Sequence, residues 1–250
     1  MAPITFRVFL KPLKFASINE TMNRTFTNMA RFILDELIPP LIRDNKFFMW
    51  PFFAIFCRKW DVSFEMNFKS HVLNMSDEDF VRFYKEKKSF ASLRPTDLNG
   101  QCIQEILKFF SGTQGTVLDV GCGRHGYMVE QINRNLRGIK ASGIDINPPI
   151  GPQYHTGFVE KLPFDDGAYD FVLCTHTLEH ILDLKKGVQE LLRVARKSIV
   201  VVIPKQRYYY YTVDENINFF QNEEDIRRSF HPLVVDIQNL GGDWFTVVQK

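Results

Sequence analysis

The stretch VLDVGCGRHG, residues 117–126, constrains most strongly what this chain can fold into. An apolar run meets an acidic residue, three glycines follow closely, and a helical pattern of apolar residues begins at Tyr127. This succession predicts a buried strand, a tight loop and a helix. Because glycine has no Cβ, the chain can turn sharply at Gly121 and Gly123, and backbone N–H groups can approach a ligand at the helix N-terminus.

Beyond this loop, apolar strand patterns alternate with helical ones. We expect strands at about 116–120, 140–145, 154–159, 169–174 and 198–203, and helices at about 127–135 and 183–195. Such alternation predicts a parallel sheet with helices on both faces. The tail predicts a helix near 223–229, and strands near 232–237 and 244–249 joined by a hairpin at Gly241 and Gly242. The expected fold class is α/β, mostly parallel, with an antiparallel edge strand.

Two kinds of cofactor fit the glycine pattern. The spacing of Gly121, Gly123 and Gly126 also matches a dinucleotide-binding fingerprint, in which a diphosphate lies over the glycines. Asp119 argues against that hypothesis, because a carboxylate two residues before the first glycine repels a diphosphate. The same carboxylate suits the cationic amino group of S-adenosylmethionine, reached directly or through water. The loop therefore favours S-adenosylmethionine over NAD or FAD.

Residues 117–126 resemble the first motif of the class I S-adenosylmethionine-dependent methyltransferases, and the resemblance continues through most of residues 116–205. The stretch 157–180, GFVEKLPFDDGAYDFVLCTHTLEH, resembles the pattern in which a short acidic loop caps adenine before the fourth strand. Dehydrogenases have no equivalent of this loop. The resemblance is to the type 11 methyltransferase domain of quinone, glycan and small-metabolite pathways, and it implies a Rossmann-like sheet and S-adenosylmethionine as the cofactor.

The same resemblance implies a set of cofactor-binding residues. Asp145 ends the second strand, where a carboxylate can accept hydrogen bonds from both hydroxyls of a ribose. Position 158 usually holds Asp in the family, and here it is Phe. Phe158 would pack on the adenine face, leaving the adenine edge to the Val159 backbone, with Glu160 as a substitute acceptor. The complete candidate set is Asp119, Gly121, Cys122, Gly123, Asp145, Ile146, Phe158, Val159, Glu160 and Thr175.

Candidate catalytic residues follow the fourth strand, at the end where open α/β sheets bind ligands. Methyl transfer is an in-line displacement that depends on alignment, and a base is needed only if the acceptor must lose a proton. His180 is the first candidate base and His176 the second, since an imidazole titrates near neutral pH. A structural role for His180 is the alternative. The tyrosines at 208–211 form either a wall of the acceptor site or the packed edge of a lid.

Residues 1–95 do not match the cofactor domain, and we expect them to form a helical extension that covers the acceptor side, with the methyltransferase domain in residues 96–250. Helices are expected within 25–38, about 77–88 and 101–110. The aromatic run in residues 46–60 is flanked by basic residues, so it either packs on the main domain or contacts a membrane surface. It is too short to span a bilayer.

Composition narrows the class of protein to which this chain can belong. A 45% hydrophobic content predicts a globular protein, and the net charge of +2 has its basic excess in residues 1–60. The 4 cysteines show no metal-ligand spacing, and no signal peptide is evident, so we expect a reducing, cytoplasmic setting without a metal. We find no nucleic-acid-binding module.

The expected function is O-methylation of a small, sugar-linked or lipid-linked acceptor. Three alternatives stay open: a cofactor-binding protein without catalysis, an N- or C-methyltransferase of a small metabolite, and an NAD-dependent enzyme. Nothing in the sequence fixes the acceptor.

Overall fold

The computed structural model describes residue 29 and residues 32–56, 62–86, 95–212 and 215–250. The chain divides into two compact units, Met1–Pro39 and Pro40–Lys250. In the first unit the described residues form a single turn of π-helix, η1 (Ile33–Leu37). Much of the helix predicted within 25–38 lies outside the described residues. The second unit contains both the sheet and the helices between residues 40 and 86, so a domain boundary near residue 95 stays a prediction.

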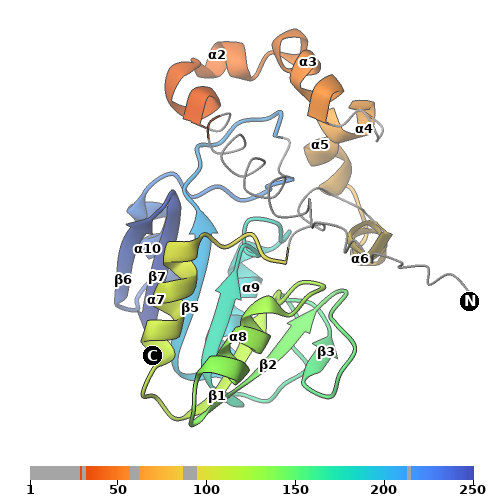
Figure 1. Ribbon diagram of the computed structural model, residues 1–250. Coiled ribbons are helices and arrows are strands. Elements are labelled where there is room, and N and C mark those ends of the chain that lie inside the picture. Colours follow the sequence, from red (N-terminus) through yellow and green to blue (C-terminus); the bar gives the residue numbers. More distant parts are fainter. Residues whose placement is uncertain (1–28, 30–31, 57–61, 87–94, 213–214) are drawn as a thin grey trace, which may run out of the picture. The chain divides into compact units, whose positions relative to one another are not determined.

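The described part of the second unit contains a seven-stranded sheet with the order β3-β2-β1-β4-β5-β7-β6. The first five strands are parallel, and β7 runs antiparallel between β5 and β6 (Figure 1). This arrangement confirms the predicted mostly parallel sheet with an antiparallel hairpin at its edge. The strands are β1 (Gly115–Val120), β2 (Ile139–Asp145), β3 (Tyr154–Thr156), β4 (Tyr169–Thr175), β5 (Ala195–Pro204), β6 (Val235–Leu240) and β7 (Asp243–Gln249).

Helices cover both faces of this sheet. Apolar residues of α7 (Gly100–Phe110) and α8 (Tyr127–Asn135) pack into one buried cluster, and those of α9 (Leu184–Val194) and α10 (Glu223–Phe230) pack into another. Side-chain caps fix where three of these helices begin: Asn99, Asp183 and Asn222 each accept a hydrogen bond from a backbone N–H in the first turn. These caps define where α7, α9 and α10 begin beside the sheet.

Five helices are described between residues 40 and 86 of the same unit. They are α2 (Pro40–Arg43), α3 (Lys46–Phe56), α4 (Val62–Met66), α5 (Phe68–Val72) and α6 (Asp77–Glu86). Phe68, Val72 and Phe80 form a small core of their own. Phe158 and Ile217, which come from loops of the sheet region, pack against this core. The helices of residues 62–86 thus contact loops that follow β3 and β5.

One predicted strand is shorter in the structure and another is shifted along the chain. The strand predicted at 154–159 ends at Thr156, and Phe158 forms only an isolated bridge with Lys161. The strand predicted from residue 232 begins at Val235, because Pro232 has no N–H to offer a ladder. Shortening of β3 moves Phe158 out of the sheet and into contact with the preceding helices.

The aromatic run of residues 46–60 has two faces where it is described. Met49 and Phe53 of α3 are fully buried, whereas Phe47 is 87% exposed and Trp50 is 55% exposed. Of the two alternatives for this segment, burial holds for one face of α3 only, and residues 57–60 lie outside the described residues. Among the helices described, none has the length and hydrophobicity needed to cross a bilayer.

Candidate functional site

The glycine loop lies at the carboxyl end of β1. Its N–H groups donate hydrogen bonds to the neighbouring strand β2. The N–H of Gly121 donates to the carbonyl of Ile144 at 2.8 Å, and the N–H of Gly123 donates to Oδ2 of Asp145 at 2.9 Å. The N–H of Asn147 donates to the other oxygen of Asp145 at 2.8 Å. Asp145 therefore organises the loop before it meets any ligand.

Gly121 and Gly123 are required for different reasons. Both have positive φ angles, of 77° and 67°, which side chains of L-residues rarely adopt. A Cβ on Gly121 would overlap the side chain of Thr177, so glycine is needed there for packing. A Cβ on Gly123 would have no described atom within 4 Å. The backbone at Gly123 therefore faces open space, as a cradle for a ligand requires.

Asp119 lies at the end of β1 and is almost fully buried. Its Oδ1 has no hydrogen-bond partner among the described residues. Burial, and to a lesser degree the charge of Asp145, raises the pKa of Asp119 to about 8. A buried carboxyl oxygen without a hydrogen-bond partner is costly, and a cationic group placed beside it would favour the ionised form of Asp119. The binding of a cationic amino group at Asp119 stays a prediction.

In the structure, the side chains of the residues after β3 contact other parts of the protein. Glu160 accepts a hydrogen bond from the N–H of Leu182 at 3.2 Å, so one carboxylate oxygen holds the loop after β4. Val159 packs on the core of the α9 face, and Phe158 packs on the core formed by Phe68 and its neighbours. Phe158 thus has protein partners on its side chain, and its role at an adenine face stays a prediction.

The remaining predicted cofactor residues lie beside the same loop. Cys122 is buried with its Sγ 3.7 Å from the carbonyl of Gly123, and burial raises the pKa of its thiol. The carbonyl of Thr175 accepts a hydrogen bond from the hydroxyl of Thr177 at 2.9 Å. Ile146 directly follows Asp145 at the end of β2. The sequence thus assembles these residues at one edge of the sheet.

His176 is bracketed by two carboxylates. Its Nδ1 lies 3.2 Å from Glu179, and its Nε2 lies 3.4 Å from Asp243 of β7. Burial by itself would lower the pKa of His176, but Asp243 and Glu179 outweigh it and raise the pKa to about 10. A histidine that stays protonated at neutral pH cannot accept the proton of a substrate. The geometry therefore argues against His176 as a base and for a structural role.

His180 has a different environment. Its Nδ1 lies 3.3 Å from the backbone carbonyl of Glu215. A carbonyl only accepts hydrogen bonds, so Nδ1 carries the proton in the neutral ring and Nε2 carries the lone pair. A backbone carbonyl therefore fixes the tautomer. Glu179 pairs with His176.

Two further side chains, those of Tyr84 and Lys69, were not among the predicted site residues. Tyr84 of α6 lies with its ring centroid 6.4 Å from that of His180. Lys69 of α5 is buried, and its ammonium donates to the carbonyl of Tyr209 while lying 4.4 Å from the centre of the Tyr208 ring. Neither could be found from the sequence, because both contacts join segments about a hundred or more residues apart.

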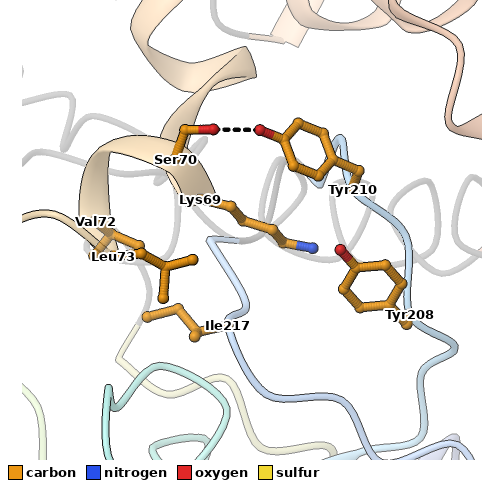
Figure 2. A pocket seen from close by; sticks show the side chains of 7 residues that line it. All are labelled: Lys69, Ser70, Val72, Leu73, Tyr208, Tyr210 and Ile217. Carbon is orange, nitrogen blue, oxygen red and sulfur yellow. Dashed lines mark hydrogen bonds between the residues drawn. The ribbon is translucent and has the colours of Figure 1, made fainter.

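Lys69 lines a cavity of about 180 Å³ (Figure 2). Figure 2 shows its side chain extending between Ser70, which is hydrogen-bonded to Tyr210, and the ring of Tyr208. Burial lowers the pKa of Lys69 to about 7, against the opposing charge of Asp44. Two of the predicted wall tyrosines therefore line a cavity. The residues around it are Lys69, Ser70, Val72, Leu73, Tyr208, Tyr210 and Ile217.

The other two wall tyrosines behave differently. Tyr209 is buried, and its hydroxyl accepts a hydrogen bond from Gln206 at 3.0 Å. The ring of Tyr211 packs edge-on against that of Tyr210. Within the described residues, no group of three or more His, Cys, Asp or Glu side chains is arranged to hold a metal ion.

Comparisons with known proteins show which proteins this chain is similar to. Residues 118–203 match the sequence profile of the methyltransferase domain. Ajmaline N-methyltransferase of Rauvolfia serpentina is 31% identical over 100 residues, 35% of this chain and 34% of that protein. The ubiquinone/menaquinone biosynthesis C-methyltransferase UbiE of Citrifermentans bemidjiense is 27% identical over 104 residues, 36% of this chain and 44% of that protein. The match thus spans less than half the length of these curated relatives.

A solved structure agrees at the level of the fold. The putative methyltransferase in complex with the Haloferax volcanii Trm112 methyltransferase activator superposes with a TM-score of 0.55 at 15% identity, covering 70% of this chain and 99% of that one. Residues 118–203 thus match a methyltransferase domain, and the sheet around them has the fold of a solved methyltransferase. The match to a methyltransferase domain implies S-adenosylmethionine as the cofactor.

Two structural observations agree with S-adenosylmethionine as the ligand of this site. The partnerless buried oxygen of Asp119 can receive a cationic amino group, and the open space at Gly123 leaves room for a ligand against the backbone. Asp145, at the end of β2, would hold the ribose hydroxyls. Its hydrogen bonds to the loop oppose the effect of burial, which raises its pKa.

Proposed function

We propose that this chain transfers the methyl group of S-adenosylmethionine to a small acceptor, and that the acceptor atom is oxygen. The observation that carries the proposal is the convergence of Asp119, the loop at Gly123 and Asp145 at one edge of the sheet, inside the segment that matches the methyltransferase domain. A cofactor held there would present its methyl group toward the loop that follows β4.

His180 is the base in this proposal. The displacement forms a methyl–oxygen bond and breaks the methyl–sulfur bond, and the hydroxyl proton must be removed. The Glu215 carbonyl on Nδ1 leaves Nε2 of His180 as the atom that accepts this proton. His176 contributes by tying the end of β4 to β7 through Asp243.

The acceptor is proposed to be small, sugar-linked or lipid-linked. The cavity beside Tyr208 and Tyr210 supports this, because tyrosine rings and hydroxyls suit a partly polar ligand. The exposed aromatic face of α3 supports the lipid-linked variant. Nothing in these two features distinguishes a glycan from another hydroxyl-bearing molecule.

N-methylation is the second candidate. The charges of Glu215, Glu179 and Glu160 lie close enough to Tyr84 to affect its pKa, and carboxylates near the reacting atoms would attract an amine. One of the curated relatives is named an N-methyltransferase and another a C-methyltransferase. Cofactor binding without catalysis is the third candidate.

The decisive experiment has a binding arm and a turnover arm. Calorimetry with S-adenosylhomocysteine should give binding, NADH should give none, and Asp145→Ala should abolish binding in a folded protein. Turnover with isotope-labelled S-adenosylmethionine should then transfer label to catechol more readily than to tryptamine. Preference for tryptamine would favour N-methylation, and binding without any transfer would favour the non-catalytic candidate. Binding of NADH alone would overturn the cofactor assignment.

A further inference from the structure

Tyr84 carries a hydroxyl for which the described part of the protein provides no hydrogen-bond partner. Its hydroxyl is buried, and no described residue forms a hydrogen bond with it. Its ring packs in α6 against Phe80, with centroids 4.8 Å apart, and against Phe83 at 5.2 Å. A buried hydroxyl without a partner costs stability, so ring packing alone would be better served by phenylalanine. The hydroxyl therefore points to a ligand.

The surroundings of Tyr84 indicate which ligand. Its ring lies 6.4 Å, centroid to centroid, from His180, the proposed base. The end of α6 is joined to the glycine loop, because Arg124 donates a hydrogen bond to the carbonyl of Lys85 at 3.3 Å. Helix α6 thus brings Tyr84 to the edge of the sheet where cofactor and acceptor must meet.

The hydroxyl of Tyr84 is suited to donate a hydrogen bond. Burial, followed by the charges of Glu215, Glu179 and Glu160, holds the pKa of Tyr84 well above its ordinary value. The hydroxyl therefore keeps its proton at neutral pH. A ligand that satisfies it must offer a lone pair, as an oxygen does.

We propose that Tyr84 is a positioning residue of the acceptor site, whose hydroxyl donates a hydrogen bond to an acceptor oxygen adjacent to the one that is methylated. The inference rests on the proposed function and deepens it, since it assigns the acceptor to molecules with two neighbouring oxygens, such as vicinal diols. The attacking hydroxyl gives its proton to Nε2 of His180 and forms the bond to the methyl carbon, and S-adenosylhomocysteine leaves. The second oxygen, held by Tyr84, fixes the direction of attack.

The test compares Tyr84→Phe with Tyr169→Phe, a matched control at the amino end of β4, away from the site. The probes are catechol, which has two adjacent hydroxyls, and phenol, which has one. We expect Tyr84→Phe to unfold at an equal or higher temperature than the wild type and to bind S-adenosylhomocysteine normally. Its KM for catechol should rise about tenfold, and the preference for catechol over phenol should disappear. Tyr169→Phe should keep both the KM and the preference.

Two results would overturn the inference. A lower unfolding temperature for Tyr84→Phe would mean that the hydroxyl is already bonded within the protein. An unchanged catechol preference in that variant would mean that the acceptor does not touch it. If the wild type methylates neither probe, methylation of catechol and phenol is excluded, and the unfolding temperatures alone test whether the hydroxyl of Tyr84 lacks a partner within the protein.

Discussion

Asp119 is the residue whose protonation should respond most directly to the cofactor. With a pKa of about 8, its carboxyl is mostly neutral at pH 7 in the free protein. The cationic amino group of S-adenosylhomocysteine favours the carboxylate, so binding should release a proton below pH 8. We expect the affinity to rise up to about tenfold per pH unit from pH 6 to pH 8 and to level off above. Calorimetry in buffers of different ionisation enthalpy measures the released proton directly.

The control for this prediction is Asp119→Asn, which keeps the shape of the side chain and cannot ionise. It should bind more weakly and release no proton between pH 6 and pH 8. The same pH dependence in the variant as in the wild type would show that another group titrates on binding.

Gly121 and Gly123 allow a second comparison at the scale of single residues. Gly123→Ala should fold, at a strain cost of about 1 kcal/mol, and should weaken S-adenosylhomocysteine binding because the methyl group enters the open space of the cradle. Gly121→Ala should lower the unfolding temperature much more, because its Cβ overlaps Thr177. Thermal unfolding and calorimetry on both variants check this. Equal loss of stability in the two would contradict the distinct roles.

The turn at the glycine loop could be predicted from the sequence because its causes are local. A turn that needs glycine and a strand that ends in a carboxylate can be recognised within ten residues. The role of His176 could not be predicted in this way. Its partner Asp243 is far away in sequence and arrives beside it only because β7 pairs with β5.

At the scale of elements, the strand and helix pattern from residue 115 to the end was largely predictable. Apolar runs separated by helical periodicity specify a parallel sheet, and the glycine pair at 241–242 specifies the hairpin of β6 and β7. The segment before residue 95 was not predictable in the same detail. Its short helices are fixed by contacts with distant loops, such as the hydrogen bond from Arg43 to the carbonyl of Tyr208 at 2.9 Å.

Helices α2 and α3 present an exposed apolar face with a testable consequence. Leu41 is 89% exposed and Phe47 is 87% exposed, with Trp50 close by in sequence. Aromatic and aliphatic side chains beside basic residues favour a lipid–water interface. We expect the protein to float with anionic vesicles at low salt, and Phe47→Ser with Trp50→Ser to reduce flotation strongly.

The matched control for flotation is Ile150→Ser, which removes a fully exposed apolar side chain from the loop after β2. It should leave flotation unchanged. Failure of the wild type to float would instead favour coverage of this face by protein, and the lipid-linked acceptor would lose its support.

At the scale of the whole molecule, two buried cations should give opposite contributions to stability above neutral pH. His176 has a folded pKa of about 10, above its ordinary 6.5, so its stabilising effect is complete below pH 6.5 and is lost as the pH rises through 10. Lys69 has a folded pKa of about 7, below its ordinary 10.5, so stability is gained as the pH rises from 7 to 10.5. Between pH 8 and pH 9 the two effects should nearly cancel.

Separate variants should reveal the cancellation. The change in the free energy of unfolding of the wild type from pH 8 to pH 9 is the reference, because Asp119 and the cysteines also titrate in this range and contribute alike to all three proteins. Relative to the wild type, the change in His176→Gln should be more positive by about 1 kcal/mol, because the loss from His176 is removed. In Lys69→Met it should be more negative by about the same amount, because the gain from Lys69 is removed. Urea denaturation at the two pH values measures each change. Parallel curves for all three proteins would show that neither side chain is perturbed as its contacts imply.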